Sequence, residues 1–375
     1  MSAVAFLNTL RPQVPPQLQP KIDSFITLYD KKLWHQLTVE LEDFVHHKES
    51  ARFLQPIYSN FIADFEKEIN QLSLVKIAHA VSKQLKDANQ AFEFMTSVAN
   101  KVVDCQEALV VARLEAANYK LLQGDVEFTE TVIEECNKII DKMMFVEPFL
   151  QATFYRVVTD FEKIKANYTG YYKNALLYLA CVDVDKMELN EKVQRAVDLG
   201  LAALLSDKIY NFGELLLHPI LEALSGPNEW IRHALFAFNC GDLQKFEQQS
   251  SVFANHTLLN QQAGFLKQKI SLMALIECAF KRQGQGRSIP FAVISQETKI
   301  PENEIEFLVM KALSLNIIKG SIDQVNQVVN INWVQPRVLN REQIGSVKNS
   351  ISQWRERISE IVALAETETK EILVQ

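Results

Sequence analysis

The chain has 375 residues, which is more than one ordinary compact core contains, so two or three domains or an extended array are expected. Gly and Pro number only 11 each, about half their usual share, which disfavours strands and tight turns. The net charge of −7 repels phosphate and excludes general nucleic-acid binding by the chain as a whole.

Cysteines and apolar runs predict the compartment. The five cysteines stand far apart, without a C-x-x-C pair, as in a reducing environment. The start of the chain has no basic segment of the kind that precedes a secretory signal. The longest apolar run, residues 175–182, is far shorter than the roughly 18 residues of a membrane span. We therefore expect a soluble protein of the cytoplasm and nucleus.

Apolar residues recur at helical spacing from about residue 21 to residue 282. The breaks between these helices are short and polar, at Gly124-Asp125, Phe212-Gly213 and Gly241-Asp242. Gly can end a helix in the left-handed conformation, and Asp can cap the next one. The pattern predicts an all-α dominated chain, with helix hairpins stacked as a right-handed, tetratricopeptide-like α-solenoid; an ordinary helical bundle is the alternative.

The sequence changes character after Arg282. A polar linker, QGQGRS, leads to an apolar run at residues 289–293 and a short segment at residues 295–298. Pro301 then stands at the first turn of a helix, and two strand-like runs follow with a turn at residues 323–327. The order strand, helix, helix, strand, strand predicts a winged helix.

The last segment predicts one long helix from Asn340 to about Leu373. Asn340 is suited to cap it, with Gln343 in the capping-box position. Apolar residues then alternate by threes and fours, which predicts a seam for partner helices. This seam comprises Ile344, Val347, Ile351, Trp354, Ile358, Ile361 and Ala365.

Motifs for catalysis or cofactor binding are missing from the sequence. There is no Walker loop, H-E-x-x-H, G-x-S-x-G or metal-spaced Cys/His set. His46 and His47 are adjacent and would point apart on a helix, and no strand precedes Gly284 and Gly286. We therefore expect no enzyme activity, no cofactor and no metal.

A winged helix raises the question of DNA binding. The helix after Pro301 carries Glu302, Glu304 and Glu306 against one basic residue, Lys311. A base-reading helix presents Arg or Lys instead, so this helix is expected to be buried or docked. We expect the last strand of the wing to offer an unpaired edge to a neighbouring sheet. The residues expected at this edge are Val328, Val329, Ile331, Trp333 and Val334.

Residues 226–335 contain two distinctive stretches, IRHALFAFNCGDLQKFE and NEIEFLVMKALSLNIIKGSID. Through these stretches the segment resembles the PCI domain, which is shared by the 26S proteasome lid, the COP9 signalosome and the translation initiation factor three complex. The stretch from Glu306 to Asp323, with Gly320 at its turn, is the most specific. The segment from Trp333 to Leu339 narrows the resemblance to the proteasome lid.

The resemblance implies a non-catalytic scaffold. Lid subunits align their winged helices side by side, gather their C-terminal helices into one bundle, and contact the proteasome core and base. The domains expected here are a helical-repeat array at 1–225, a PCI domain at 226–335 and a bundling helix at 336–375. Within the PCI domain, the helical half spans 226–282 and the winged helix 289–335. The alternatives are a PCI subunit of the signalosome or the initiation factor complex, or a nucleic-acid-binding winged-helix protein.

Overall fold

The structure is a computed structural model that describes residues 3–45, 47–85, 87–249, 253, 256–282, 288–338 and 341–368. The expectations for His46, for Gly284 and Gly286 in the linker, and for Asn340 as a helix cap lie outside these residues. The chain divides into two compact units, Met1–Met187 and Glu188–Gln375.

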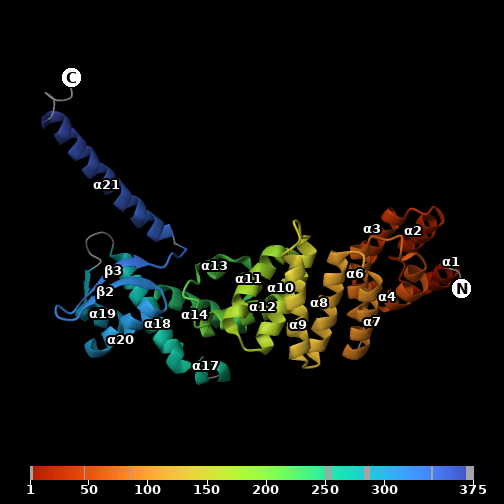
Figure 1. The fold of residues 1–375 in the computed structure, drawn as a ribbon, viewed down its shortest axis with the longest axis horizontal. Coiled ribbons are helices and arrows are strands. Elements are labelled where there is room, and N and C mark those ends of the chain that lie inside the picture. The colour runs from red at the N-terminus through yellow and green to blue at the C-terminus, as the bar shows by residue number, and fades with distance from the viewer. Residues whose placement is uncertain are drawn as a thin grey trace. The chain divides into compact units, whose positions relative to one another are not determined.

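The first unit is built of helices joined by short connections. Figure 1 shows helices α6 to α11 standing side by side, and α8 packs against α6, α7, α9 and α10. Buried aromatic rings pack against one another in its N-terminal part, where Phe25 lies edge-on to Phe44 at 5.5 Å between ring centroids. The helices are α1 Ala3–Leu10, α2 Gln19–Asp30, α3 Trp34–Val45, α4 Ala51–Ile57, α5 Ala63–Phe65, α6 Gln71–Ser82, α7 Ala88–Lys101, α8 Gln106–Leu122, α9 Val126–Ile140, α10 Pro148–Ile164 and α11 Tyr168–Cys181.

The second unit combines helices with one small sheet. Its helices are α12 Leu189–Leu205, α13 Gly213–Leu217, α14 Glu229–Cys240, α15 Leu243–Gln248, α17 Thr257–Gln261, α18 Ala263–Lys281, α19 Phe291–Thr298, α20 Glu302–Ser314 and α21 Arg341–Glu368. The strands are β1 Ser288–Pro290, β2 Ile318–Asp323 and β3 Val328–Val334. The fold is thus a helical solenoid with a winged helix and a long terminal helix, as predicted.

Two of the three predicted Gly turns have the expected geometry. Gly124 and Gly241 adopt φ of 90° and 63°, and the Asp that follows each of them caps the next helix. Gly213 differs, because it is the first residue of α13 and its φ is not positive. A Cβ at Gly213 would lie 2.5 Å from Cβ of Val338, so close packing excludes a side chain there.

The winged helix follows the predicted order, with one boundary shifted. The apolar run at residues 289–293 was expected to form a strand, but β1 ends at Pro290 and Phe291 begins α19. Pro290 has an extended backbone, with φ −62° and ψ 147°, and occupies the position before the helix. Phe291 is therefore buried as part of a helix, together with Ile294, and not as part of a strand.

Candidate assembly surfaces

The terminal helix α21 presents its predicted seam to solvent. Ile351 and Trp354 are 60% and 68% exposed, and Ile344, Ile358 and Ile361 are each at least half exposed. Val347 is half-buried. Contiguous apolar side chains on a water-exposed helix are typical of a surface that a partner covers.

The segment before α21 is fixed to the second unit. The backbone N–H of Gln335 donates to the carbonyl of Ile317 at 2.8 Å. The buried guanidinium of Arg337 is paired with Glu277 and lies 5.0 Å from the ring centroid of Phe280. Together with the contact of Val338 on Gly213, these interactions hold the chain three residues before α21 begins.

The sheet corrects the prediction for the wing. β3 was expected to offer an unpaired edge, but the strand order is β1-β3-β2, with both neighbours antiparallel to β3. Val329 therefore pairs with Ile289 on one side and with Ile322 on the other. The prediction was wrong for Val328 and Val329, because β1, some 40 residues earlier in the chain, pairs with Val328–Asn330 on the side of β3 that was taken to be open. Among the described residues β1 does not reach Ile331, Trp333 or Val334, for which the prediction stays open. In the described part of the sheet the edge positions belong to β1, to β2, Ile318–Asp323, and to the side of β3 that β1 leaves unpaired beyond Asn330.

The residues predicted at that edge have different environments. Val329 and Ile331 are buried, Val328 and Val334 are half-buried, and Trp333 is 36% exposed. The ammonium of Lys319 on β2 lies 5.0 Å from the centroid of the Trp333 ring, a cation–π contact on the outer face of the sheet.

Helix α20 is half buried rather than enclosed. Ile305, Leu308 and Val309 pack inward, whereas Phe307 and Met310 are 70% and 51% exposed. Glu302 and Glu304, on its first turn, are exposed as well. This outer face is apolar and acidic, which is the opposite of a helix that reads bases in the groove of DNA.

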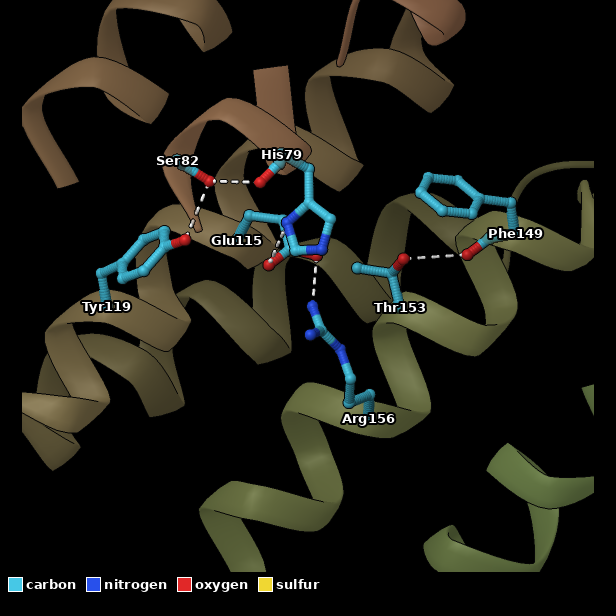
Figure 2. Close-up of polar contacts among 7 residues, drawn as sticks. All are labelled: His79, Ser82, Glu115, Tyr119, Phe149, Thr153 and Arg156. Carbon is cyan, nitrogen blue, oxygen red and sulfur yellow. Dashed lines mark hydrogen bonds and ion pairs between the residues drawn. The ribbon is translucent and has the colours of Figure 1, made fainter. Parts of the chain in front are cut away.

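A buried charged cluster in the first unit had no counterpart in the predictions. Figure 2 shows the carboxylate of Glu115 on α8 between His79 on α6 and Arg156 on α10. Its Oε2 lies 3.1 Å from Nδ1 of His79, and Arg156 donates a hydrogen bond to Oε1. Next to it, the Tyr119 hydroxyl donates to Ser82 Oγ at 2.8 Å. The cluster thus connects three helices of the solenoid.

The surroundings of this cluster set its charges. Burial alone would raise the pKa of Glu115, but the positive charge of Arg156 and the neighbouring His79 outweigh burial and hold that pKa at about 2. For His79, burial is the larger effect and lowers its pKa below the ordinary value. Glu115 is only 1% exposed, so its carboxylate is closed to a substrate, and its contacts join α8 to α6 and α10.

A second buried charge, Lys269 on α18, holds the end of α12. Its ammonium donates to the carbonyls of Ala203, Leu204 and Ser206, at 2.8, 3.1 and 2.5 Å. These three acceptors match the three N–H donors of an ammonium group. They are also carbonyls of a helix end, which the helix itself leaves without partners. Burial lowers the pKa of Lys269 to about 7.

The cysteines and the possible metal ligands bear on the expectation that the chain has no catalytic or metal site. Cys136 and Cys278 are buried, and burial raises the pKa of Cys136 to about 12, which disfavours a nucleophilic thiolate. Among the residues that the structure describes, no group of three or more His, Cys, Asp or Glu side chains is arranged to hold a metal ion. The same part of the chain contains no helix long and apolar enough to cross a membrane.

Comparison with known proteins adds family evidence to this geometry. The model for PSD13 N-terminal repeats matches residues 21–235, and the PCI domain model matches residues 243–333. The chain is 36% identical to 26S proteasome non-ATPase regulatory subunit 13 homolog B of Arabidopsis thaliana over 386 residues, which cover 100% of each chain. It is 37% identical to the probable 26S proteasome regulatory subunit rpn9 of Schizosaccharomyces pombe, covering 98% of this chain and 97% of that protein.

A weaker similarity is confined to part of the chain. Eukaryotic translation initiation factor 3 subunit M of Dictyostelium discoideum is 24% identical over 188 residues, 48% of this chain. The first two relatives, by contrast, align with both compact units, and the repeat model alone matches more than half of the chain. The chain belongs to the family of 26S proteasome non-ATPase regulatory subunit 13.

Proposed function

We propose that this chain is a non-catalytic scaffold subunit of the regulatory particle lid of the 26S proteasome, acting in ubiquitin-dependent degradation in the cytoplasm and nucleus. The observation that carries the proposal is the exposed apolar seam of α21, with Ile351 and Trp354 facing solvent. The chain just before this helix is held in place by the contacts of Arg337. The choice of complex rests on the names of the relatives that align over nearly their whole length, which are regulatory subunits of the 26S proteasome.

Two surfaces are assigned to assembly. The seam of α21 joins the C-terminal helices of other lid subunits in a helical bundle, since burial of its side chains would remove large apolar areas from water. The winged helix contacts other PCI-type subunits. Its outer strand β2, Ile318–Asp323, offers an edge on which a neighbouring sheet could extend, as does the side of β3 that β1 leaves unpaired beyond Asn330 in the described residues. The helical repeats are proposed to contact the proteasome core and base.

The test is a native pulldown of the tagged full-length chain beside a truncation that ends at Val338. We expect proteasome lid and core subunits, identified by mass spectrometry, to accompany the full chain and to be lost or depleted with the truncation. Recovery of signalosome or initiation factor subunits would contradict the proposal, as would equal recovery of lid subunits by both proteins. Circular dichroism of the truncation serves as the control that the remainder is folded.

A further inference from the structure

Basic and acidic residues of α21 occupy different positions relative to its apolar seam. Its seam repeats every seven residues along two lines, Ile344, Ile351 and Ile358 on one and Val347, Trp354 and Ile361 on the other. In such a repeat, one border of the seam consists of the residues four positions after each member of the first line. The other border consists of the residues three positions after each member of the second line. These two borders determine which charges a partner helix meets.

Basic side chains occupy the borders of the seam. Lys348 and Arg355 lie on one border, and Arg357 lies on the other. All three are exposed. We call this set the basic border.

Acidic side chains lie elsewhere on the helix. Glu356 and Glu360 occupy positions on the side away from the seam, and both are exposed. Farther along, Val362 and Leu364 continue the two borders as apolar residues. The basic border therefore accompanies the first two heptads of the seam and ends at Arg357.

We propose that α21 docks on partner helices whose own apolar seam is bordered by Asp and Glu side chains opposite Lys348, Arg355 and Arg357. This inference rests on the proposed function and adds the chemistry of the partner to it. Border residues of one helix lie against border residues of the next in a helical bundle, so opposite charges there favour the correct partner and register. The segregation of basic residues beside the seam and acidic residues away from it is the pattern that an acidic partner would require.

A second copy of this chain does not meet the requirement. In an antiparallel pair the border with Lys348 and Arg355 would face itself, so cation would meet cation. In a parallel pair this border would face the one with Ser350 and Arg357, which offers no acidic residue. Like charges at these positions disfavour association, so the basic border excludes self-pairing as well as selecting an acidic partner.

The test compares full-length chains that bear two matched triple substitutions. In the first, Lys348→Gln, Arg355→Gln and Arg357→Gln neutralise the basic border. In the second, Ser346→Glu, Asn349→Glu and Gln353→Glu change the net charge by the same −3 on exposed positions away from the seam. The probe is lid assembly reconstituted without this chain, and the dissociation constant is measured by fluorescence anisotropy in about 50 mM and about 500 mM salt.

We expect neutralisation of the basic border to weaken binding roughly tenfold in low salt and less than about threefold in high salt, because salt screens exposed charge pairs. The second triple variant should bind as the wild type does. Equal weakening by both triple variants, or wild-type binding by the neutralised one, would overturn the acidic partner. The double variant Ile351→Asp/Trp354→Asp separates the two hypotheses: if it alone loses binding, the seam stands without the basic border, and if it also binds normally, the proposed function itself is wrong.

Discussion

At the scale of single residues, the chain places charge in its interior where neighbouring helices supply the partners. Glu115 is closed off from solvent, and its charge is balanced by Arg156, while the imidazole of His79 lies next to its other carboxylate oxygen. Removing one member of a buried pair leaves the other charge without compensation, which costs far more than the net stability that the intact pair provides. The Glu115 carboxylate is therefore expected to be indispensable for the first unit.

Replacing Glu115 by Gln should lower the free energy of unfolding by about 3–5 kcal/mol, because Arg156 would then face a neutral amide. Urea denaturation followed by circular dichroism measures the effect. The matched control is Glu135→Gln, which removes the exposed pair with Arg113 and should cost less than about 1 kcal/mol. Similar losses in the two variants would show that the buried cluster adds no special stability.

The same cluster predicts a dependence on pH through His79. Its pKa is lower in the folded chain than the ordinary 6.5, so below pH 6.5 the unfolded chain binds a proton that the folded chain does not. Stability should consequently fall as the pH is lowered through this range. His79→Gln should show a shallower loss of stability between pH 6.5 and 5 than the wild type, measured by urea denaturation at each pH. A His79→Gln slope equal to that of the wild type would mean that the imidazole is not held neutral.

Lys269 makes a comparable prediction for the second unit. Lys269→Met keeps much of the aliphatic stem but leaves the carbonyls at the end of α12 without a donor, and we expect a loss of about 3 kcal/mol in the free energy of unfolding. Lys267→Met, on an exposed position of the same helix, should change it by less than about 0.5 kcal/mol. Chemical denaturation of the two variants in parallel tests this, and equal stability would argue that the ammonium does not hold the helix end.

At the scale of elements, features set by local sequence were predictable and pairings between distant segments were not. The period of apolar residues identified α21, and Pro301 marked the start of α20, because both signals act within a few residues. The position of β3 depends on β1, whose Ser288 pairs with Asn330 across the whole helical part of the winged helix. No local pattern reports that pairing, so the sequence could not show which strand lies in the centre.

The buried charges were missed for the same physical reason. Glu115 lies among apolar residues of α8, and the sequence offers only that faint signal, since its partners come from α6 and α10. Lys269 likewise meets carbonyls more than 60 residues away. Both clusters exist only once the helices have packed, whereas the seam of α21 could be predicted from the sequence because it repeats along one helix.

The exposed seam makes an element-scale prediction. Ile351→Asp/Trp354→Asp should leave the isolated chain as stable as the wild type, because both side chains already face water. Incorporation into the lid should be blocked, since loss of a buried Trp alone costs about 3–5 kcal/mol. Asn349→Asp/Gln353→Asp, with the same charges on exposed positions outside the seam, should assemble normally. Native gel electrophoresis of reconstituted lid distinguishes the variants, and normal assembly of the seam variant would remove the bundle from consideration.

At the scale of the whole molecule, the chain joins a well-buried solenoid to a helix with little tertiary support of its own. Helix α18 buries residues all along its length, whereas the apolar seam of α21 is largely exposed. Helices without packing on an apolar face are marginally stable in water. The contrast implies that α21 gains most of its stability only when a partner covers it.

Amide hydrogen exchange measures that gain directly. In the isolated full-length chain, amides of residues 344–365 should exchange at least tenfold faster than those of Leu272 to Leu275 in α18, because opening an exposed helix costs little free energy. In the assembled lid, exchange across 344–365 should slow by at least about tenfold while α18 stays unchanged, which makes α18 the internal control. If residues 344–365 were as protected in the isolated chain as α18, the seam would already be covered by the chain itself, and its assignment to a partner would fail.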